Sequence, residues 1–201
     1  MAEVKVLIPG VHRLTADETV EVWCTTTLIK SDINIIVDPG SYINRDNLIS
    51  ALKAENLAPS DIQAVFLTHT HIDHTTNMYL FSHAKIYSRL ISGQYKGQYQ
   101  MIEKGLVYRF DLLNQPIAHE VQFIETPGHS IDSATLQVYT DEGMVAVCGD
   151  AIANESFADS GKFPEKFLVY DMDKYNESRK KILDSADWVV PGHGEKFKVT
   201  K

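Results

Sequence analysis

The feature that most constrains this chain is a local pattern that recurs four times: an apolar, strand-like run ends, and a histidine or an aspartate follows. The four segments read "VFLTHTHIDH" (65–74), "ETPGHS" (125–130), "VCGDA" (147–151) and "VVPGHG" (189–194). Glycine in the last three gives the backbone room to turn tightly where the strand stops. We therefore expect the polar side chains that follow these strands to meet along one edge of a β-sheet structure.

Several side chains in this pattern can bind a metal ion. They are His69, His71, Asp73, His74, His129, Asp150 and His193. Residues i and i+2 of an extended segment point to the same side, so His69 and His71 can converge on one ion. We expect His129 to complete this first, all-nitrogen site.

A second ion is expected beside the first. The turn after the extended segment lets Asp73 and His74 address this ion together with His193. Asp150 has two carboxylate oxygens and can contact both ions. Imidazole and carboxylate ligands without thiolate fit two divalent ions, with zinc as the expected metal and iron or manganese as alternatives.

Two divalent ions about 3.5–4 Å apart can share a water molecule and lower its pKa toward about 7, which provides a hydroxide nucleophile at neutral pH. Asp73 is expected to orient this water or to accept its proton, and Asp150 to bridge the ions around it. Both are therefore candidate catalytic residues. The pattern predicts a metal-dependent hydrolase.

Other polar residues are separate candidates. Asp38, in "IIVDPG", is expected either to accept a hydrogen bond from the ring of a ligand histidine or to cap its own turn. His12, His83 and His119 lie outside the pattern and are expected at structural or surface positions. Four tyrosines could donate a hydrogen bond to a substrate carbonyl: Tyr42, Tyr95, Tyr99 and Tyr170.

Hydrophobic periodicity predicts the elements around these motifs. Runs rich in β-branched residues predict strands at 4–10, 20–30, 33–40, 62–69, 84–88, 119–128, 133–140, 143–150 and 187–190. Helical spacing predicts helices over 44–57 and 171–186, with Asn44 and Asp171 as N-caps. The polar segment 93–105 has no clear period and is predicted to be a loop or a loosely held helix. This order favours an α/β fold in which two sheets pack face to face with helices outside.

Composition indicates the broad class of protein. With 201 residues and 44% hydrophobic content, the chain is expected to form a single domain over 1–201. Its net charge of −8 gives no overall reason to expect nucleic acid or a membrane as partner, although nine Lys and Arg against seven Asp and Glu from Lys162 onward make the C-terminal part mildly basic. Cys24 and Cys148 are expected to be small apolar residues buried in strands. Two cysteines do not make a disulfide framework, so a reducing compartment is expected. Because no signal or membrane-spanning segment is visible, a cytoplasmic location is expected.

In order, "HTHIDH", "TPGHS", "GDA" and "PGHG" resemble the motifs of the metallo-β-lactamase fold superfamily. The resemblance spans "VDPG" (37–40) to "PGHGE" (191–195), and all seven candidate ligands match the motifs of the superfamily. It implies a four-layer αββα sandwich with a dinuclear metal site at one edge of the two sheets.

The resemblance is less specific for substrate, because the superfamily acts on lactams, thioesters, lactones, phosphodiesters and persulfides. Zinc β-lactamases have cysteine where this chain has Asp150, and flavodiiron proteins have glutamate where His71 stands. Quorum-quenching lactonases have a tyrosine three residues after the bridging aspartate, where this chain has Ala153. The helical domain of glyoxalase II and the insert of the nucleic-acid-cleaving branch are not expected. The segment 176–199 looks most like the compact single-domain members, a group linked to RNA cleavage.

The expected function is hydrolysis of an ester, thioester or related small-molecule bond by a metal-bridging hydroxide. An RNA phosphodiesterase or endonuclease is the first alternative, and a mononuclear iron dioxygenase acting on persulfides is the second. A metal-dependent binding module without turnover is a third. The expected partner is therefore a small-molecule substrate, with RNA as the alternative, and the oligomeric state is left open.

Overall fold

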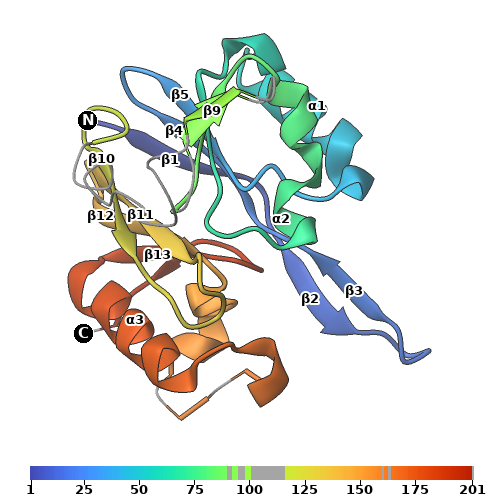
Figure 1. The fold of residues 1–201 in the computed structure, drawn as a ribbon, viewed down its shortest axis with the longest axis vertical. Helices are drawn as coiled ribbons and strands as arrows, with labels where there is room; N and C mark the ends of the chain where they lie inside the picture. Colours follow the sequence, from blue (N-terminus) through green and yellow to red (C-terminus); the bar gives the residue numbers. More distant parts are fainter. Residues whose placement is uncertain (90–91, 95–97, 101–115, 160, 163, 201) are drawn as a thin grey trace.

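Two β-sheets face each other at the centre of the fold (Figure 1). A computed structural model of the chain describes residues 1–89, 92–94, 98–100, 116–159, 161–162 and 164–200. The first sheet contains, in hydrogen-bonded order, β1 (Glu3–Ile8), β4 (Thr26–Lys30), β5 (Asn34–Val37), β6 (Ala64–Phe66), β7 (Lys85–Tyr87), β8 (Ser92–Gln94) and β9 (Gln98–Gln100). Strands β5, β6 and β7 are parallel, and the other neighbours are antiparallel.

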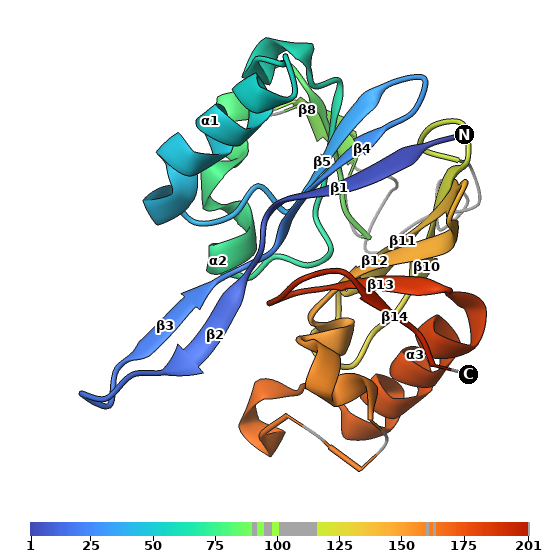
Figure 2. The ribbon, with the colours of Figure 1, turned by 180° about the vertical axis from the view of Figure 1, so that it is seen from behind.

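The second sheet is formed mainly by the second half of the chain. It contains, in order, β10 (Val121–Glu125), β11 (Ala134–Thr140), β12 (Gly143–Gly149), β13 (Trp188–Pro191) and β14 (Phe197–Lys198). Only the β12–β13 pair is parallel among these neighbours. A separate antiparallel hairpin, β2 (Val11–Leu14) and β3 (Val20–Trp23), projects from the body of the molecule in both views (Figures 1 and 2).

Helices cover the outer faces of the two sheets (Figure 2). The helices are α1 (Arg45–Ala54), α2 (Ile72–Thr75) and α3 (Met172–Ser185). Short 3-10 helices occur at Tyr42–Asn44, Pro59–Asp61, Thr76–Phe81, Asp150–Ile152, Glu155–Ala158 and Lys166–Leu168. Helix α1 lies on the first sheet and α3 on the second.

Alternation along the strands distributes their side chains between an inner and an outer core. In β5, Ile35 and Val37 point toward the second sheet, whereas Ile36 points toward α1. This follows from the two-residue period of a strand, and a strand buried on both faces is apolar at every position. Phe66 of β6 meets Phe123 of β10 between the sheets, with ring centroids 5.6 Å apart.

The outer cores attach the helices to the sheets. Leu48 and Leu52 of α1 are fully buried against the first sheet. Ile182 of α3 packs with Val189 and Cys148 on the outer face of the second sheet. The resulting order of layers, α, β, β, α, confirms the predicted fold class.

Some predicted elements differ from the structure. The run 20–30 forms two strands, because the backbone N–H of Thr25 donates to the carbonyl of Gly192 (2.6 Å) at the break between β3 and β4. The periodicity does not predict β2 or β14. Strands β8 and β9 lie within the segment 93–105 that was predicted to be a loop or helix, and the remainder of that segment lies outside the described residues.

The two predicted helix caps have different outcomes. Asn44 occupies the N-cap position of α1 as predicted, but its side chain makes no capping hydrogen bond. Asp171 caps α3 as predicted: its carboxylate accepts the backbone N–H groups of Asp173 and Lys174, each at 3.1 Å. Among the described residues, no helix combines the length and the apolarity that a bilayer crossing requires.

The two cysteine thiols are expected to be chemically inert in the native protein. Burial raises the pKa of Cys24 to about 11 and also raises the pKa of Cys148. Cys148 lies in β12 as predicted, whereas Cys24 lies between β3 and β4 rather than within a strand. Since the thiolate is the reactive species, Ellman's reagent at pH 8 should label neither thiol in the native protein and both after unfolding. Rapid labelling of the native protein would contradict this expectation.

Candidate metal centre

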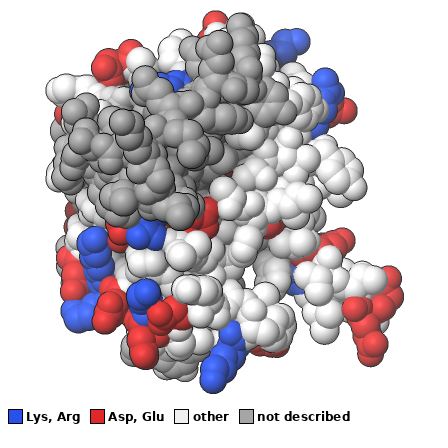
Figure 3. Space-filling model, viewed as in Figure 1, with Lys and Arg blue, Asp and Glu red and all other residues white. Residues whose placement is uncertain are grey.

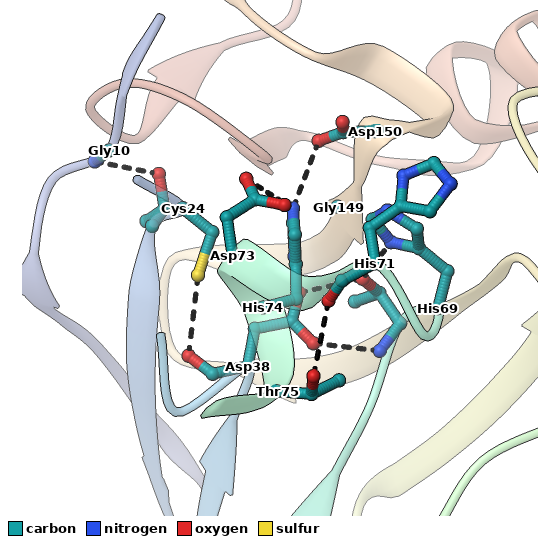
Figure 4. Close-up of polar contacts among 12 residues, drawn as sticks. Gly10, Cys24, Asp38, His69, His71, Asp73, His74, Thr75, Gly149 and Asp150 are labelled. Carbon is teal, nitrogen blue, oxygen red and sulfur yellow. Dashed lines mark hydrogen bonds and ion pairs between the residues drawn. The ribbon is translucent and has the colours of Figure 1, made fainter. Parts of the chain in front are cut away.

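Seven polar side chains lie together at the edge of the two sheets, and Figure 4 labels five of them, His69, His71, Asp73, His74 and Asp150. They come from the segments after β6, β10, β12 and β13, and they are His69, His71, Asp73, His74, His129, Asp150 and His193. These are the residues that the strand-end pattern singles out. The structure therefore brings together residues up to 124 positions apart in the sequence, 193 minus 69.

The local backbone separates the cluster after β6 into two parts. His71 is extended, with φ −64° and ψ 149°, and is the N-cap of α2. His69 and His71 therefore leave the end of the strand, while Asp73 and His74 belong to the first turn of the helix. This is the change from extended to turned backbone that the sequence pattern predicts.

The first group of potential ligands consists of three histidines and one carboxylate. One ligand-capable atom from each of His69, His71, His129 and Asp150 lies within 4.8 Å of the others. The ring centroids of His69 lie 4.5 Å from His71 and 4.8 Å from His129. His129 Nε2 lies 3.0 Å from His71 Nδ1. Three imidazoles thus surround one small volume.

The second group contains Asp73, His74 and His193, whose ligand-capable atoms also lie within 4.8 Å of one another. Asp73 Oδ2 lies 3.6 Å from His74 Nε2 and 3.7 Å from His193 Nε2. Figure 4 shows the ring of His74 between the carboxylates of Asp73 and Asp150. The two groups are therefore adjacent.

Asp150 connects the two groups through its two oxygens. Oδ1 lies 3.5 Å from His74 Nε2 and 3.3 Å from His193 Nε2, while Oδ2 lies 3.4 Å from His129 Nε2. The residue begins a 3-10 turn directly after β12 and is only 8% exposed. One carboxylate therefore faces both sets of histidines.

The residues fit metal binding by two independent tests. Three buried ligand-capable atoms of the centre have no hydrogen-bond partner among the described residues: His69 Nε2, His74 Nε2 and Asp150 Oδ1. Buried polar atoms are normally paired, so an unpaired set facing one place indicates a missing partner that is a cation. In addition, ligand atoms about 2.0–2.1 Å from a tetrahedral zinc ion lie about 3.3–3.4 Å from each other. The contacts of 3.3–3.7 Å around Asp150 and Asp73 agree with this spacing.

Hydrogen bonds fix the orientation of two of these histidines. Asp38 is 2% exposed and accepts from His74 Nδ1 (2.8 Å), from the Thr68 N–H (2.8 Å) and from the Thr68 hydroxyl (2.6 Å). His193 Nδ1 donates to the carbonyl of Trp23 (2.9 Å). Because Nδ1 is engaged in both rings, Nε2 is the nitrogen that faces the centre. The predicted contact between Asp38 and a histidine of the cluster is thus observed.

Asp132 is a supporting residue that the sequence pattern does not reveal. It is 5% exposed and lies between the two loops that carry the first group of histidines. Oδ2 accepts from the hydroxyl of Thr70, and Oδ1 accepts from the hydroxyl of Ser130, each at 2.7 Å. Thr70 lies between two histidines of the cluster and Ser130 follows a third, so this buried carboxylate sets the distance between their loops.

Two glycines allow the backbone to approach the centre closely. A Cβ at Gly192 would lie 1.8 Å from Asp150 Oδ1, and a Cβ at Gly149 would lie 2.1 Å from Thr68 Oγ1. Gly149 also has φ +51°, in the left-handed region. Any side chain at either position would displace a residue of the centre or its support.

Burial lowers the pKa of two histidines of the first group. The pKa of His69 lies well below its ordinary value, and that of His129 is also lowered, in both cases chiefly because burial disfavours the charged imidazolium. Both rings are therefore neutral at physiological pH. A neutral imidazole is the form that can donate a lone pair to a metal ion.

Neighbouring negative charges raise the pKa values of the two histidines in the second group. Burial alone would lower the pKa of His74, but Cys24, Asp38 and Asp150 raise it well above its ordinary value. The pKa of His193 is likewise raised by Asp150 against the effect of burial. In turn, burial would raise the pKa of Asp150, yet His193 and His74 hold it well below its usual range. The centre thus contains a carboxylate that retains its charge although it is buried.

A pocket of about 870 Å³ opens onto the two groups. Besides residues of the centre it is lined by His12, Ala153, Phe157, Pro164, Glu165, Val169, Tyr170 and by apolar residues of the β2–β3 hairpin and of 167–168. His12 is exposed, as expected of a surface residue, but it also lines this pocket, and its ring centroid lies 5.6 Å from that of His193. His83 bonds to the carbonyl of Ile62, and the side chain of His119 is 76% exposed, as expected for residues outside the site.

The candidate tyrosines differ in their positions. Tyr170 lines the pocket, whereas Tyr42 does not and is 75% exposed. Tyr95 and the side chain of Tyr99 lie outside the described residues. Tyr170 is therefore the candidate that the described structure places near the centre.

A sandwich of this type, with histidine and aspartate gathered at its strand ends, defines the class of metal-dependent hydrolases. Comparison with known sequences is consistent with this class. The chain belongs to the metallo-beta-lactamase superfamily, whose sequence profile matches residues 24–193.

Relatives of known name support the assignment to this superfamily. The chain is 33% identical to metallo-beta-lactamase domain-containing protein 1 of Xenopus laevis, over 98% of this chain and 82% of that protein. The human protein of the same name is 34% identical over 83% of this chain, which spans 60% of its length. A protein named as a probable metallo-hydrolase of Methanocaldococcus jannaschii is 32% identical over 79% of this chain and 70% of its own length.

Solved structures share the fold. A candidate metallo-beta-lactamase from Thermotoga maritima aligns with a TM-score of 0.70 at 23% identity, covering 98% of this chain and 99% of its own. A dizinc quorum-quenching lactonase in complex with its product aligns with a TM-score of 0.58 at 18% identity, covering 89% and 74%. At these identities the likeness concerns the fold.

Proposed function

We propose that this protein is a hydrolase that binds two divalent metal ions at the centre and cleaves an ester, thioester or related bond of a small molecule. The observation that carries the proposal is the convergence of buried, unpaired ligand atoms from His69, His74 and Asp150. A cation is the partner that such atoms share. The names of the relatives, which include a metallo-hydrolase and a dizinc lactonase, support the same function.

The proposed ligands follow the two groups. His69, His71 and His129 would hold one ion, Asp73, His74 and His193 would hold the other, and Asp150 would contact both. Histidine and carboxylate without thiolate favour zinc, with iron and manganese as alternatives. The two thiols of the chain are not among the grouped residues.

The residues of the chain determine the proposed chemistry. Bound ions would polarise the substrate carbonyl and acidify a nearby water molecule. Asp73 lines the pocket, and since its Oδ2 faces His74 and His193, its Oδ1 would accept the proton of that water. The water oxygen bonds to the acyl carbon and the acyl–oxygen or acyl–sulfur bond breaks. Asp73 then returns its proton to the departing alcohol or thiol, and Tyr170, which lines the pocket, would donate a hydrogen bond to the substrate.

Metal analysis combined with a substrate panel tests this proposal. Protein purified without chelator should contain about two ions per chain, and a chelator should abolish hydrolysis of every active ester, thioester or lactone. Adding one kind of metal should restore the activity. An oligoribonucleotide and oxygen uptake on a persulfide complete the panel, because they report the two alternative reactions.

Paired histidine variants sharpen the test. His71→Ala should lower the metal content and reduce kcat/KM at least about a hundredfold, since metal ligands provide several kcal/mol of transition-state stabilisation. His83→Ala is the matched control outside the centre and should change neither. About one iron per chain with oxygen uptake, or metal-dependent cleavage of RNA alone, would contradict the proposed reaction.

A further inference from the structure

The β2–β3 hairpin has one apolar face with no protein layer over it among the described residues. His12 pairs with Val22 and Leu14 pairs with Val20, so these four side chains share a face. Leu14 is 70% exposed, Val20 55% and Val22 40%, and all line the pocket. An isolated two-stranded hairpin gains little stability by itself, so an uncovered apolar face on it needs another explanation.

The opposite face of the hairpin is polar toward its tip, while Val11 and Trp23 lie on that face at the base, where Trp23 packs against the outer core. Arg13 and Glu21 occupy the intervening paired positions and form an ion pair at 2.7 Å. The hairpin therefore has one face built for water and one face directed at the pocket. The apolar side chains of Leu14, Val20 and Val22 therefore all face the pocket, and the Arg13–Glu21 ion pair faces away from it.

A second apolar surface faces the hairpin across the pocket. This surface lies C-terminal to the 3-10 helix Asp150–Ile152. Its residues that line the pocket are Phe157, Phe167, Leu168 and Tyr170. Phe167 is 79% exposed and Tyr170 66%. Large aromatic side chains at such exposure are typical of binding surfaces. The pocket thus has two apolar walls, and the histidine and aspartate centre lies between them.

The charges around the pocket disfavour an anionic ligand chain. No Lys or Arg is present among its described lining residues, which include the acidic Glu165 as well as Asp73 and Asp150. Asp17 and Glu18 lie in the turn of the hairpin, and acidic side chains gather at its tip (Figure 3). Binding of a nucleic acid backbone requires cationic contacts to its phosphates. A neutral, apolar group fits these walls better.

The order of polar and apolar residues along the hairpin also indicates how a ligand would be oriented in the pocket. His12 lies beside His193 at the centre, while Leu14 and Val20 are farther along the hairpin toward its tip. A molecule with a polar carbonyl end and an apolar tail matches this order. The volume of about 870 Å³ lies within the range of pockets that bury a ligand of drug size.

We propose that the substrate is an ester or thioester with a medium-length apolar acyl chain, which lies between the β2–β3 hairpin and the wall formed by Phe157, Phe167 and Leu168. The carbonyl end lies at the metal centre beside His12. This inference rests on the proposed hydrolase function and specifies its substrate class.

A chain-length series tests the inference. Acetyl, butanoyl, hexanoyl, octanoyl and decanoyl thioesters of one thiol are hydrolysed by metal-loaded protein, and kcat/KM is measured for each. Burial of each added methylene should raise kcat/KM about fourfold until the chain fills the pocket. A flat series from acetyl to decanoyl would overturn the inference and leave the hydrolase function intact.

Variants on the two walls connect the series to the structure. Leu14→Ser and Phe167→Ser should each reduce kcat/KM for the decanoyl substrate at least about tenfold more than for the acetyl substrate. Arg13→Ser, on the polar face of the same hairpin, is the control and should leave the series unchanged. An equal loss for all chain lengths in both wall variants would overturn the inference.

A binding measurement distinguishes this inference from the hydrolase proposal. Decanoate and acetate are titrated into the metal-loaded protein by calorimetry. Decanoate should bind at least about a hundredfold more tightly, and Leu14→Ser should reduce that preference. If no ester, thioester or lactone is hydrolysed but this preference is observed, the hydrolase proposal fails and the apolar pocket stands. If hydrolysis occurs but acetate and decanoate bind equally, the pocket assignment fails.

Discussion

Asp150→Asn is expected to lower kcat/KM for any ester that the native protein hydrolyses by at least about a thousandfold, a factor that corresponds to about 4 kcal/mol. Asparagine keeps the volume of the side chain but replaces one oxygen with an NH2 group, which cannot bind a cation. In the native chain Oδ1 faces His74 and His193 and Oδ2 faces His129. Whichever way the amide turns, one metal position loses its shared ligand, so metal analysis should find fewer ions per chain.

The same variant has a readout that does not depend on activity. In the metal-free protein Asp150 raises the pKa of His193 against the lowering effect of burial. Without this carboxylate charge, the pKa of His193 should fall, which NMR titration of the histidine rings in the metal-free native and variant proteins would show.

Asp141→Asn is the matched control, since Asp141 is exposed in the turn between β11 and β12. It should leave metal content, rate and histidine pKa values unchanged. Full metal loading with an undiminished rate in Asp150→Asn would show that this carboxylate does not bridge the centre.

The gathering of seven side chains at the candidate metal centre is visible in the sequence because most of these residues are marked locally. His129 and His193 directly follow a glycine, and Asp150 does so as well. Strand order and layer order then follow from the two-residue alternation of apolar side chains, as in Ile35, Ile36 and Val37.

The surroundings of the centre are less visible in the sequence because they depend on contacts between distant segments. Asp132 has no motif of its own, and its role arises only when Thr70 and Ser130 meet it from different loops. His12 reaches the pocket because a hairpin outside both sheets folds back beside His193. The backbone hydrogen bond from Thr25 to Gly192 divides the run 20–30, which is rich in β-branched residues, into two strands. Local β-propensity does not predict this break.

Asp38 provides the structural connection between fold and centre. Its position directly after β5, with φ +51°, turns its carboxylate toward the loop after β6. There it accepts hydrogen bonds from both Thr68 and His74. The residue is thus held in a left-handed conformation that is uncommon outside glycine and asparagine-like residues. The same carboxylate supports the backbone of the loop and orients a proposed metal ligand.

Asp38→Ala is expected to destabilise the metal-free protein by about 3–5 kcal/mol, because it removes one partner of a fully buried pair. The Thr68 N–H, the Thr68 hydroxyl and His74 Nδ1 would each lose their acceptor in a place where water does not replace it. For a chain of this size, that loss corresponds to a decrease in Tm of about 6–20 °C. Calorimetry or denaturant unfolding of the metal-free protein measures the effect.

The control and a milder variant separate the two roles of this carboxylate. Asp46→Ala removes a carboxylate that is 87% exposed in the first turn of α1, and it should change stability by no more than about 0.5 kcal/mol. Asp38→Asn keeps one acceptor oxygen, so it should lose less stability than Asp38→Ala while metal affinity still falls about 10–100-fold, as measured by competition with a chelator. An Asp38→Asn protein with native metal affinity would show that Asp38 supports the fold alone, since the orientation of His74 would then not depend on its charge.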